Sequence, residues 1–390
     1  MDFRFTPEQD AFRKEIHDFL DAELTPEMRR EMAERPEEGG FSPEFSRNLA
    51  RKGLIGVAWP KEYGGKGMGY IERLIYNEEM TYAQAPVRFH HMSERQMGPS
   101  IILYGTEEQK KEFLPRITAG DLCFCAGYTE PGAGSDLASL QARAVLDGDD
   151  FVINGQKTYT SGAHMAHYIW LACRTNPDVP KHKGVSVLIV DMQSPGLTVR
   201  PLITMSGGRF SEVFFDNVRV PRRNLVGELN QGWYIVASNL DFERSGIERV
   251  AANALLFEKL GAYVRTATVN GRRLADDPLV RNRLAETAIE FQVGRLLAYR
   301  VAWQMSQGKH PNHEASMSKV FGSELSQRVT AIALQVMGLA GQLGPGSRWA
   351  PLDGTFLSPF LGAVSDTIRG GTSEVQRNII ASRGLGLPRA

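Results

Sequence analysis

Apolar residues recur at helical spacing through roughly the first 120 positions, behind polar segments that signal helix starts. The segment Thr6-Pro7-Glu8-Gln9 offers a capping hydroxyl, a proline at the first helical position and a glutamine placed to close a capping box. The apolar residues that follow it are Phe12, Ile16, Phe19 and Leu20. Thr106-Glu107-Glu108-Gln109 repeats the start signal before a further helix. Since no run of strand-like residues competes here, this region is predicted to be mainly helical.

From about Leu122 the pattern changes to short runs rich in β-branched and aromatic residues. Glycine, proline and asparagine separate these runs, of which the clearest are 151–153, 168–171 and 185–190. Asn154-Gly155 stands between two such runs and predicts a tight hairpin. The section up to about Trp233 is therefore predicted to form a compact antiparallel sheet or barrel.

Beyond Trp233, glycine and proline become rare within long segments that carry apolar residues at spacings of three and four. Long helices are predicted over 234–266, 277–307 and 313–342. Strands and helices do not alternate as they would in a parallel, doubly wound sheet. The fold class is thus α+β, with an N-terminal helical domain over 1–121, a middle antiparallel β-barrel domain over 122–233 and a C-terminal helical bundle over 234–390.

The composition is that of a globular chain that acts on a small molecule. Its 390 residues, 42% of them hydrophobic, suffice for two or three folding regions. Forty-five basic residues balance forty-five acidic ones, and this balance excludes the basic surface expected when the main partner is nucleic acid or an anionic membrane. Three cysteines cannot form a disulfide framework and the amino terminus lacks a basic and apolar leader, so a cytoplasmic protein is expected.

The most informative segment is Tyr128-Thr129-Glu130-Pro131-Gly132-Ala133-Gly134-Ser135-Asp136. It lacks the third glycine and the strand-turn-helix context of a dinucleotide fingerprint, so a nicotinamide site is not indicated. A plain turn would explain the two glycines. They would equally let the backbone approach a flat ligand closely, with Thr129 and Ser135 offering hydroxyls to its edge.

Five segments, in order, make the chain resemble the acyl-CoA dehydrogenase family over nearly its whole length. They are Trp59-Pro60-Lys61-Glu62-Tyr63-Gly64-Gly65, Tyr104-Gly105-Thr106-Glu107-Glu108-Gln109-Lys110, the run at 129–136, Asn154-Gly155-Gln156-Lys157 and Gly370-Gly371-Thr372-Ser373-Glu374-Val375-Gln376-Arg377. Such enzymes bind FAD and desaturate the Cα–Cβ bond of an acyl-CoA thioester. A carboxylate removes the α proton while the β hydrogen leaves as hydride to flavin N5. The resemblance also implies an electron-transfer flavoprotein as the electron acceptor.

The resemblance assigns ligand contacts by position. The cofactor-binding residues that it implies are Gly127, Tyr128, Thr129, Ser135, Tyr159, Thr160, Ser161, Gly371, Thr372 and Glu374. Thr129 would be the side-chain donor on the pyrimidine side of the flavin, and Ser161 would approach N5. Without the resemblance, Tyr159 and Ser161 would be interpreted as consecutive strand residues. Ser135 and Gly370 would also contact the substrate, Ser135 at the pantetheine chain.

The catalytic base is where the sequence departs from the best-known family pattern. Many members place a glutamate directly before the Gly-Thr of the tail, but here that position is Gly370, which cannot accept a proton. In the isovaleryl and long-chain branches the glutamate precedes an arginine on the first long helix of the C-terminal bundle. Leu240-Asp241-Phe242-Glu243-Arg244 matches that pattern. The resemblance thus implies Glu243 as the base, Arg244 as the cation near the CoA 3′-phosphate and Asp241 as a polar substrate contact.

An alternative base is Glu248, because Glu248-Arg249 repeats the dipeptide five residues later. On one continuous helix, five residues rotate a side chain by roughly 140°. Only one of the two pairs can then face the substrate, and Glu243 is preferred. The simpler interpretation of Glu243 is an exposed carboxylate that interacts with the helix dipole.

Two further departures concern the neighbouring subunit. Homotetrameric members carry an arginine followed by Phe-Gly that reaches the FAD of the next subunit, whereas 265–271 has no Phe-Gly. The family's Gln-x-x-Gly-Gly-x-Gly is also incomplete over 335–341. This asymmetry resembles the subgroup that acts on CoA thioesters of steroid side chains, a heterotetramer with two copies of each of two related dehydrogenase chains. The partner subunit would supply the missing FAD contacts.

Other interpretations remain open. The same fold serves acyl-CoA oxidases and flavin monooxygenases, and the chain could also be a catalytically silent partner subunit, although the Glu243-Arg244 pair speaks against this. No metal site is predicted, since Cys123-x-Cys125 has no second cysteine pair and His164-x-x-His167 has no accompanying carboxylates. His90-His91 falls where the family places the acyl pocket and is interpreted as a structural pair.

Overall fold

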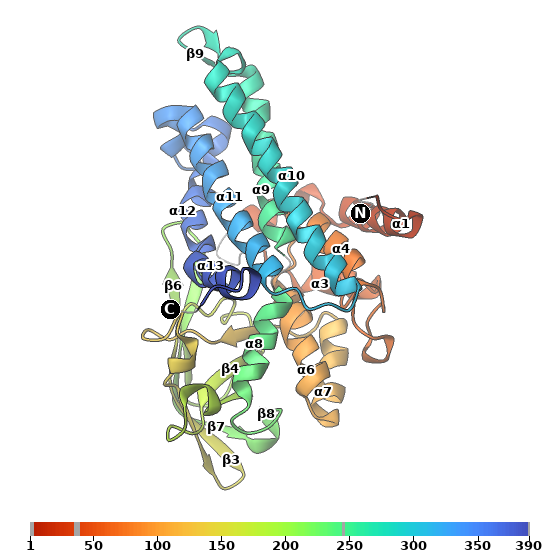
Figure 1. The fold of residues 1–390 in the computed structure, drawn as a ribbon, viewed down its shortest axis with the longest axis vertical. Helices are drawn as coiled ribbons and strands as arrows, with labels where there is room; N and C mark the ends of the chain where they lie inside the picture. Colours follow the sequence, from red (N-terminus) through yellow and green to blue (C-terminus); the bar gives the residue numbers. More distant parts are fainter. Residues whose placement is uncertain (1–3, 35–39, 244–245, 389–390) are drawn as a thin grey trace.

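The computed structural model describes residues 4–34, 40–243 and 246–388, with the backbone alone at 240–243. In these ranges the chain forms three successive parts, helical, β and helical again (Figure 1). The order expected from the sequence is confirmed, whereas the domain boundaries after residues 121 and 233 stay a prediction. Of the helices in the described ranges, none is both long and apolar enough to cross a membrane.

The N-terminal part contains α1 (Pro7–Glu23), α2 (Pro26–Glu34), α3 (Pro43–Arg51), α4 (Tyr70–Tyr82), α5 (Arg88–Met92), α6 (Gly98–Tyr104) and α7 (Glu107–Thr118). Both predicted capping boxes are present. Thr6 Oγ1 accepts from the N–H of Gln9 at 3.3 Å, and Thr106 Oγ1 accepts from the N–H of Gln109 at 3.2 Å. The predicted inner face of α1 is buried through Phe12, Ile16, Phe19 and Leu20.

A π-helical turn, Ser93–Met97, joins α5 to α6, so that residues 88–104 form one helical stretch. Trp59 packs against this turn. Its Nε1 donates to the carbonyl oxygen of Glu94 at 3.1 Å, and its ring covers Gly98, where a Cβ would come within 2.0 Å of the indole. The turn widens the helix and places the charged side chains of Glu94 and Arg95 in the interior.

The middle part is a sheet of β1 (Phe124–Gly127), β2 (Arg143–Asp147), β3 (Asp150–Lys157), β4 (Tyr168–Arg174), β5 (Val185–Asp191), β6 (Leu197–Ile203), β7 (Arg209–Pro221) and β8 (Leu225–Val226). The order is β6-β7-β3-β2-β4-β5-β8, with β1 beside β4. Most pairs are antiparallel, but β1 and β2 run parallel to β4, so the sheet is mixed where the sequence predicted an antiparallel one. Long connections permit this, because parallel neighbours require a crossover.

The predicted hairpin at Asn154-Gly155 is wrong. Strand β3 runs through these residues, and its register with β7 shifts between Ile153 and Gly155. Gly155 has φ +145°, and a Cβ there would lie 2.6 Å from the Cα of Ala142. The Asn-Gly pair therefore forms a β-bulge, which requires the conformational freedom of glycine just as a tight hairpin turn does. The tight turn lies at Gly148 instead, between β2 and β3.

The C-terminal part contains α8 (Gly232–Glu243), α9 (Ile247–Thr266), α10 (Pro278–Ser306), α11 (His313–Met337), α12 (Leu357–Asp366) and α13 (Ser373–Ile379). A small hairpin of β9 (Thr268–Val269) and β10 (Arg272–Arg273) joins α9 to α10 at the far end of the molecule (Figure 1). The long helices predicted over 277–307 and 313–342 are present as α10 and α11, with a 3-10 turn completing the second.

The single helix predicted over 234–266 is instead two helices, α8 and α9. Gly246 precedes α9 with φ +81°, a left-handed conformation that glycine adopts readily. A Cβ on Gly246 would lie 2.5 Å from Ser318 Oγ on α11, so a larger residue has no room. Because α8 and α9 are separate helices, Glu243 and Glu248 are not related by the 140° rotation expected on one continuous helix.

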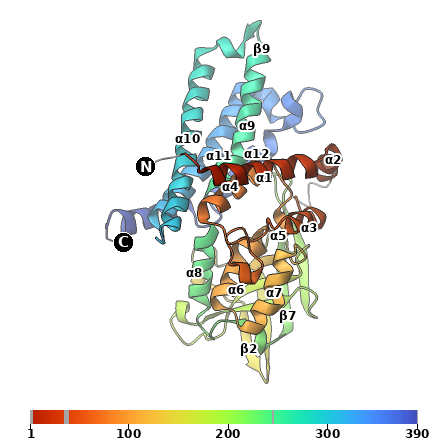
Figure 2. The same ribbon diagram turned by 90° about the vertical axis from the view of Figure 1, so that its right-hand side faces the viewer.

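Helix α8 lies beside α6 in both ribbon views (Figures 1 and 2), and in Figure 1 it stands between the sheet and α6. It packs against β5, α6 and the π-helical turn. Two polar contacts fix it to α6: Tyr104 Oη lies 2.8 Å from Ser238 Oγ, and Asn239 Nδ2 donates to Ser100 Oγ at 3.2 Å. The end of α8 is thus held at the meeting point of the three parts.

The bulge predicts a position-specific cost for glycine replacement. Gly155→Ala should lower the free energy of unfolding by about 2–4 kcal/mol, because the added Cβ meets backbone and the conformation is strained. Gly148→Ala is the matched control, since Gly148 also has positive φ (+62°) but open space around it, and it should cost about 1 kcal/mol. Urea unfolding of both variants measures the difference, and equal losses would contradict the role assigned to the bulge.

Candidate active site

A buried ion pair joins the ends of β1 and β3. Lys157, the last residue of β3, is fully buried, and its Nζ lies 2.7 Å from Glu130 Oε1. The same Nζ donates to the carbonyl oxygen of Tyr128 at 3.0 Å. The carboxylate of Glu130 also accepts from the N–H groups of Gln141 and Ala142, at 2.6 and 2.8 Å. Burial lowers the pKa of Lys157, and the adjacent Glu130 opposes that effect.

This pair brings two groups of predicted cofactor residues side by side. The N–H of Thr158 donates to the carbonyl oxygen of Thr129 at 2.9 Å, which sets the loop after β1 against the loop after β3. Gly127 ends β1, and Tyr128 and Thr129 follow it directly. Positions 159–161 follow β3 and lie in a turn, so they are not strand residues.

The turn after β3 exposes an aromatic ring next to a buried hydroxyl. Tyr159 has φ +54° and is 58% exposed, with its ring 6.0 Å from that of Phe210. Thr160 is buried, and its N–H donates to the carbonyl oxygen of Ser211 at 2.9 Å. Ser161 is exposed. A non-glycine residue held at positive φ often marks a functional site.

The glycine-rich turn projects from the same end of the sheet. Glu130 and Ala133 exchange two backbone hydrogen bonds of 3.0 and 3.1 Å across it. Ser135 is exposed, and a Cβ placed on Gly132 or Gly134 would have no heavy atom within 4 Å. The protein itself therefore does not need these two glycines for packing, which leaves their surface open to a ligand.

The tail residues form the turn between α12 and α13. Gly370 and Gly371 have φ of +66° and +85°, and Gln376 Nε2 donates to the carbonyl oxygen of Gly370 at 3.1 Å. Thr372 caps α13 by accepting from the N–H of Val375 at 3.2 Å. A glutamate at position 370 would have to adopt a left-handed conformation. The backbone thus accounts for a glycine where the best-known members carry their base.

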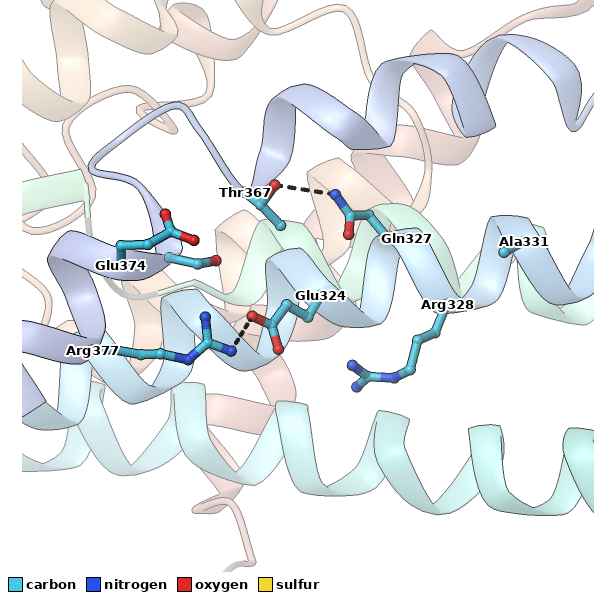
Figure 3. Close-up of a pocket in the computed structure, with 8 residues that line it drawn as sticks. Glu324, Gln327, Arg328, Ala331, Thr367, Glu374 and Arg377 are labelled. Carbon is cyan, nitrogen blue, oxygen red and sulfur yellow. Dashed lines mark hydrogen bonds and ion pairs between the residues drawn. The ribbon is translucent and has the colours of Figure 1, made fainter. Parts of the chain in front are cut away.

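Glu374 lines an open polar pocket of about 510 Å³ between α11 and α13 (Figure 3). Across it, Arg377 pairs with Glu324 at 2.6 Å, and Gln327 Nε2 donates to Thr367 Oγ1 at 3.1 Å. Hydrogen bonds from its own backbone N–H and from Thr372 lower the pKa of Glu374. The predicted cofactor residue is therefore an accessible anion at the start of α13.

The tail also lies near α5. Arg369 lies close enough to Arg88, at the start of α5, for the two charges to repel each other. Arg369 directly precedes Gly370 and is paired with Asp366. The tail turn and the start of α5 consequently belong to one region of the molecule.

The predicted base stands at the junction of α8 and α9. Glu243 is the last residue of α8, but its side chain and that of Asp241 lie outside the described residues, as does Arg244 as a whole. The alternative base is already engaged, because Glu248 Oε1 lies 2.7 Å from Nη1 of the buried Arg95. That ion pair favours Glu243, whose role stays a prediction.

The histidine pair is structural, in agreement with the interpretation from the sequence. His90 lies within hydrogen-bond distance of Ser46 Oγ (2.8 Å) and Tyr76 Oη (3.3 Å), and burial lowers the pKa of His90 to about 3. His91 Nε2 lies 2.8 Å from Arg95 Nη1. Within the described ranges, no group of three or more histidine, cysteine, aspartate or glutamate residues is placed to hold a metal ion.

Sequence reasoning missed the two charged pairs that organise the site. Glu130 and Lys157 stand inside two of the segments that carry the family resemblance, but nothing in either segment indicated that they meet. Arg95 carried no signal at all, because its burial depends on the π-helical turn.

Comparison with known proteins decides the family. Three family models match: the N-terminal domain of acyl-CoA dehydrogenases over residues 6–121, the middle domain over 125–218 and the C-terminal domain over 230–385. The chain belongs to the acyl-CoA dehydrogenase family. It is accordingly an oxidoreductase.

Relatives of this acyl-CoA dehydrogenase cover its full length. Acyl-CoA dehydrogenase FadE26 of Mycobacterium tuberculosis is 39% identical over 400 residues, which is 100% of both chains. The solved Tcur3481-Tcur3483 steroid ACAD is 38% identical with a TM-score of 0.90, covering 100% of both chains. The ChsE4-ChsE5 complex of Mycobacterium tuberculosis gives 39% identity and a TM-score of 0.90 at the same coverage. The family resemblance and its steroid subgroup are thereby confirmed.

The family implies a flavin, and the residues at the ends of β1 and β3 fit one. The hydroxyl of Thr160 is buried and has no hydrogen-bond partner among the described residues. The open surface of Gly132 and Gly134 and the exposed ring of Tyr159 lie on the same loops. A flat ligand with polar edges matches this combination of an aromatic face, spare hydroxyl and uncovered backbone.

The buried pair predicts a large and specific loss on substitution. Lys157→Met should lower the free energy of unfolding by about 3–5 kcal/mol, because it leaves the carboxylate of Glu130 buried without a cation. Lys181→Met is the matched control: Lys181 pairs with Asp136 at 2.6 Å, but both side chains are about half exposed, and the loss should stay below about 1 kcal/mol. Urea denaturation compares them. Similar losses in the free energy of unfolding would show that the buried pair of Lys157 and Glu130 contributes no more than an exposed pair.

Proposed function

We propose that this chain uses FAD to convert an acyl-CoA thioester to the trans-2-enoyl-CoA. The observation that supports this most is the joining of the loops after β1 and β3 by Lys157 and Glu130. That contact gathers Gly127, Thr129 and Thr160 at one end of the sheet, beside the glycine-rich turn. Membership of the acyl-CoA dehydrogenase family over the full length supports the same reaction.

The cofactor, when bound, supplies the acceptor for the β hydride. Thr129 would donate its hydroxyl to the pyrimidine edge, and Tyr159 and Thr160 would pack along the ring with Ser161 towards N5. Gly371, Thr372 and Glu374 would contact the cofactor from the tail. The buried hydroxyl of Thr160 and the positive φ of Tyr159 support this arrangement.

Glu243 would remove the α proton from the end of α8. Hydrogen bonds to the thioester carbonyl must acidify that proton, since it is not acidic in isolation. Ser135 would hold the pantetheine chain, and Arg244 and Asp241 would bind the CoA portion. The engagement of Glu248 with Arg95 supports the choice of Glu243.

The proposed substrate class is a CoA thioester with a bulky, steroid-derived acyl group. Two of the most similar solved assemblies support it, one of them named a steroid ACAD. The glycine at position 370 removes a side chain from the substrate end of the tail. A base on α8 and a glycine in the tail together leave space near the α carbon for a branched group.

We also propose that the functional unit is a heterotetramer of this chain and a related dehydrogenase subunit. The heterotetramer would pass its electrons to an electron-transfer flavoprotein. Both similar solved assemblies carry the names of two chains. Gln335 begins the incomplete Gln-x-x-Gly-Gly-x-Gly segment, and its side-chain oxygen accepts from Arg283. Residues 268–273 form a small exposed hairpin in place of the Phe-Gly segment.

Replacement of the base separates cofactor binding from chemistry. Glu243→Gln should keep the bound flavin yellow and abolish its anaerobic bleaching by acyl-CoA, since an amide cannot accept the α proton. Glu258→Gln, which alters an exposed carboxylate hydrogen-bonded to Tyr82, is the control and should bleach normally. Bleaching of the Glu243 variant at a near-normal rate would refute the assignment. Oxygen consumption by the reduced enzyme would indicate an oxidase or monooxygenase.

Flavin retention tests the proposed assembly. Purified alone, the chain should hold little FAD, because its own residues complete only the ring-binding half of the site. Co-expression with a related dehydrogenase subunit should raise the FAD content towards one per pair of chains, measured by absorbance after denaturation. Full FAD occupancy in a homotetramer of this chain would contradict the proposal.

A further inference from the structure

One helical stretch, residues 88–104, holds both sides of the junction between α8 and α9. On the α8 side, Ser100 and Tyr104 of α6 bind Asn239 and Ser238. On the α9 side, the π-helical turn supplies Arg95, whose Nη1 lies 2.7 Å from Oε1 of Glu248. The stretch therefore fixes the positions of the last turns of α8 and the first turn of α9 relative to each other.

Burial and a contact with His91 hold the side chain of Arg95 in this position. Its side chain is only 4% exposed, and Nη1 also lies 2.8 Å from Nε2 of His91, one turn earlier. A guanidinium only donates, so the ring nitrogen must accept and His91 must be neutral. Burial lowers the pKa of His91 well below its usual value, and the charge of Arg95 adds to this effect. The backbone of the stretch thus orients the guanidinium towards α9.

Arg95 has charged neighbours of both signs among the described residues. Arg73 of α4 donates to the carbonyl oxygen of Arg95 at 3.4 Å. The carboxyl group of Glu94 interacts electrostatically with both arginines. Burial raises the pKa of Glu94, and Arg73 and Arg95 oppose that effect. Among the described residues, the two arginines thus interact with two carboxyl groups, those of Glu94 and Glu248. Removal of one member leaves a net charge in the interior, whereas removal of an opposite pair does not.

The opposite side of the junction is closely packed against α11. Gly246 adopts φ +81° against α11, where a Cβ would lie 2.5 Å from Ser318 Oγ. Gly322 of α11 similarly faces Arg249, with 3.1 Å between its ideal Cβ and the Cβ of Arg249. The start of α9 is therefore packed against α11 on one side and bound to the 88–104 stretch on the other.

We infer that Arg95 is a positioning residue for the catalytic base: through Glu248 it holds the α8–α9 junction in the geometry that places Glu243 against the substrate. The inference rests on the function proposed above. Arg95 itself need not touch the substrate. A displacement of about 1 Å at a reacting group can cost about 100-fold in rate, so loss of the contact should act on the chemical step more than on binding.

The test compares Arg95→Met, the double variant Arg95→Met/Glu248→Met and Arg95→Lys in the FAD-loaded assembly, with Arg219→Met as an exposed-arginine control. The probe is whichever acyl-CoA reduces the wild-type flavin fastest. The single methionine variant should lose thermal stability. The double variant should regain it, because the charges balance again, yet reduce flavin about 100-fold more slowly with acyl-CoA affinity within about threefold of wild type. Arg95→Lys should restore most of the rate, and Arg219→Met should match wild type.

Hydrogen exchange provides a readout independent of catalysis. In the double variant, amides over 240–250 should exchange faster than in wild type, with β3 and β7 unchanged. A double variant that reduces flavin at the wild-type rate, or whose 240–250 amides are unaltered, would overturn the inference. If wild type itself fails to reduce flavin with any acyl-CoA, the proposed function is wrong, and the exchange data alone then decide whether Arg95 holds the junction.

Discussion

The contact between Lys157 and Glu130 is the constraint on which the site depends. Two charges have been taken out of water, and each is matched by a directional partner: the ammonium by a carboxylate and a carbonyl, the carboxylate by two backbone N–H groups as well. Such pairs add little net stability, but they strongly penalise any arrangement in which the partners are apart. The loops after β1 and β3 therefore meet in one way only, although their exposed residues interact weakly with each other.

The ion pair of Arg95 with Glu248 imposes the same kind of constraint on the helical side of the site. Arg95 is buried and Glu248 is partly buried, and their ion pair connects the N-terminal helices to the C-terminal bundle. Helix α8 is in contact with the sheet and with the 88–104 stretch. The apolar cores continue across the boundaries between the parts: one cluster joins N-terminal helices, the sheet and α8, and another packs Leu74 against Ile247. The polar contacts add directional constraints where the parts meet. Orientation at that meeting point is what proton and hydride transfer require.

Local signals were sufficient for much of the fold. The capping boxes at Thr6 and Thr106 involve residues three apart, and the sequence predicts them fully. The Asn154-Gly155 signal was misassigned because bulges and hairpins demand the same backbone freedom. The break at Gly246 was missed because apolar spacing continues across it. For the site, the resemblance placed the residues after β1 and β3 together, but contacts between distant segments, such as Arg95 with Glu248, have no signature in either segment.

The two left-handed glycines of the tail limit where this enzyme can carry its catalytic base. Gly370 holds a positive φ that disfavours any side chain, and its carbonyl oxygen is bound by Gln376. A glutamate placed at position 370 of this chain would therefore strain the tail turn. One substitution thus does not move the base of this chain to the tail, because the backbone of the turn would have to change with it.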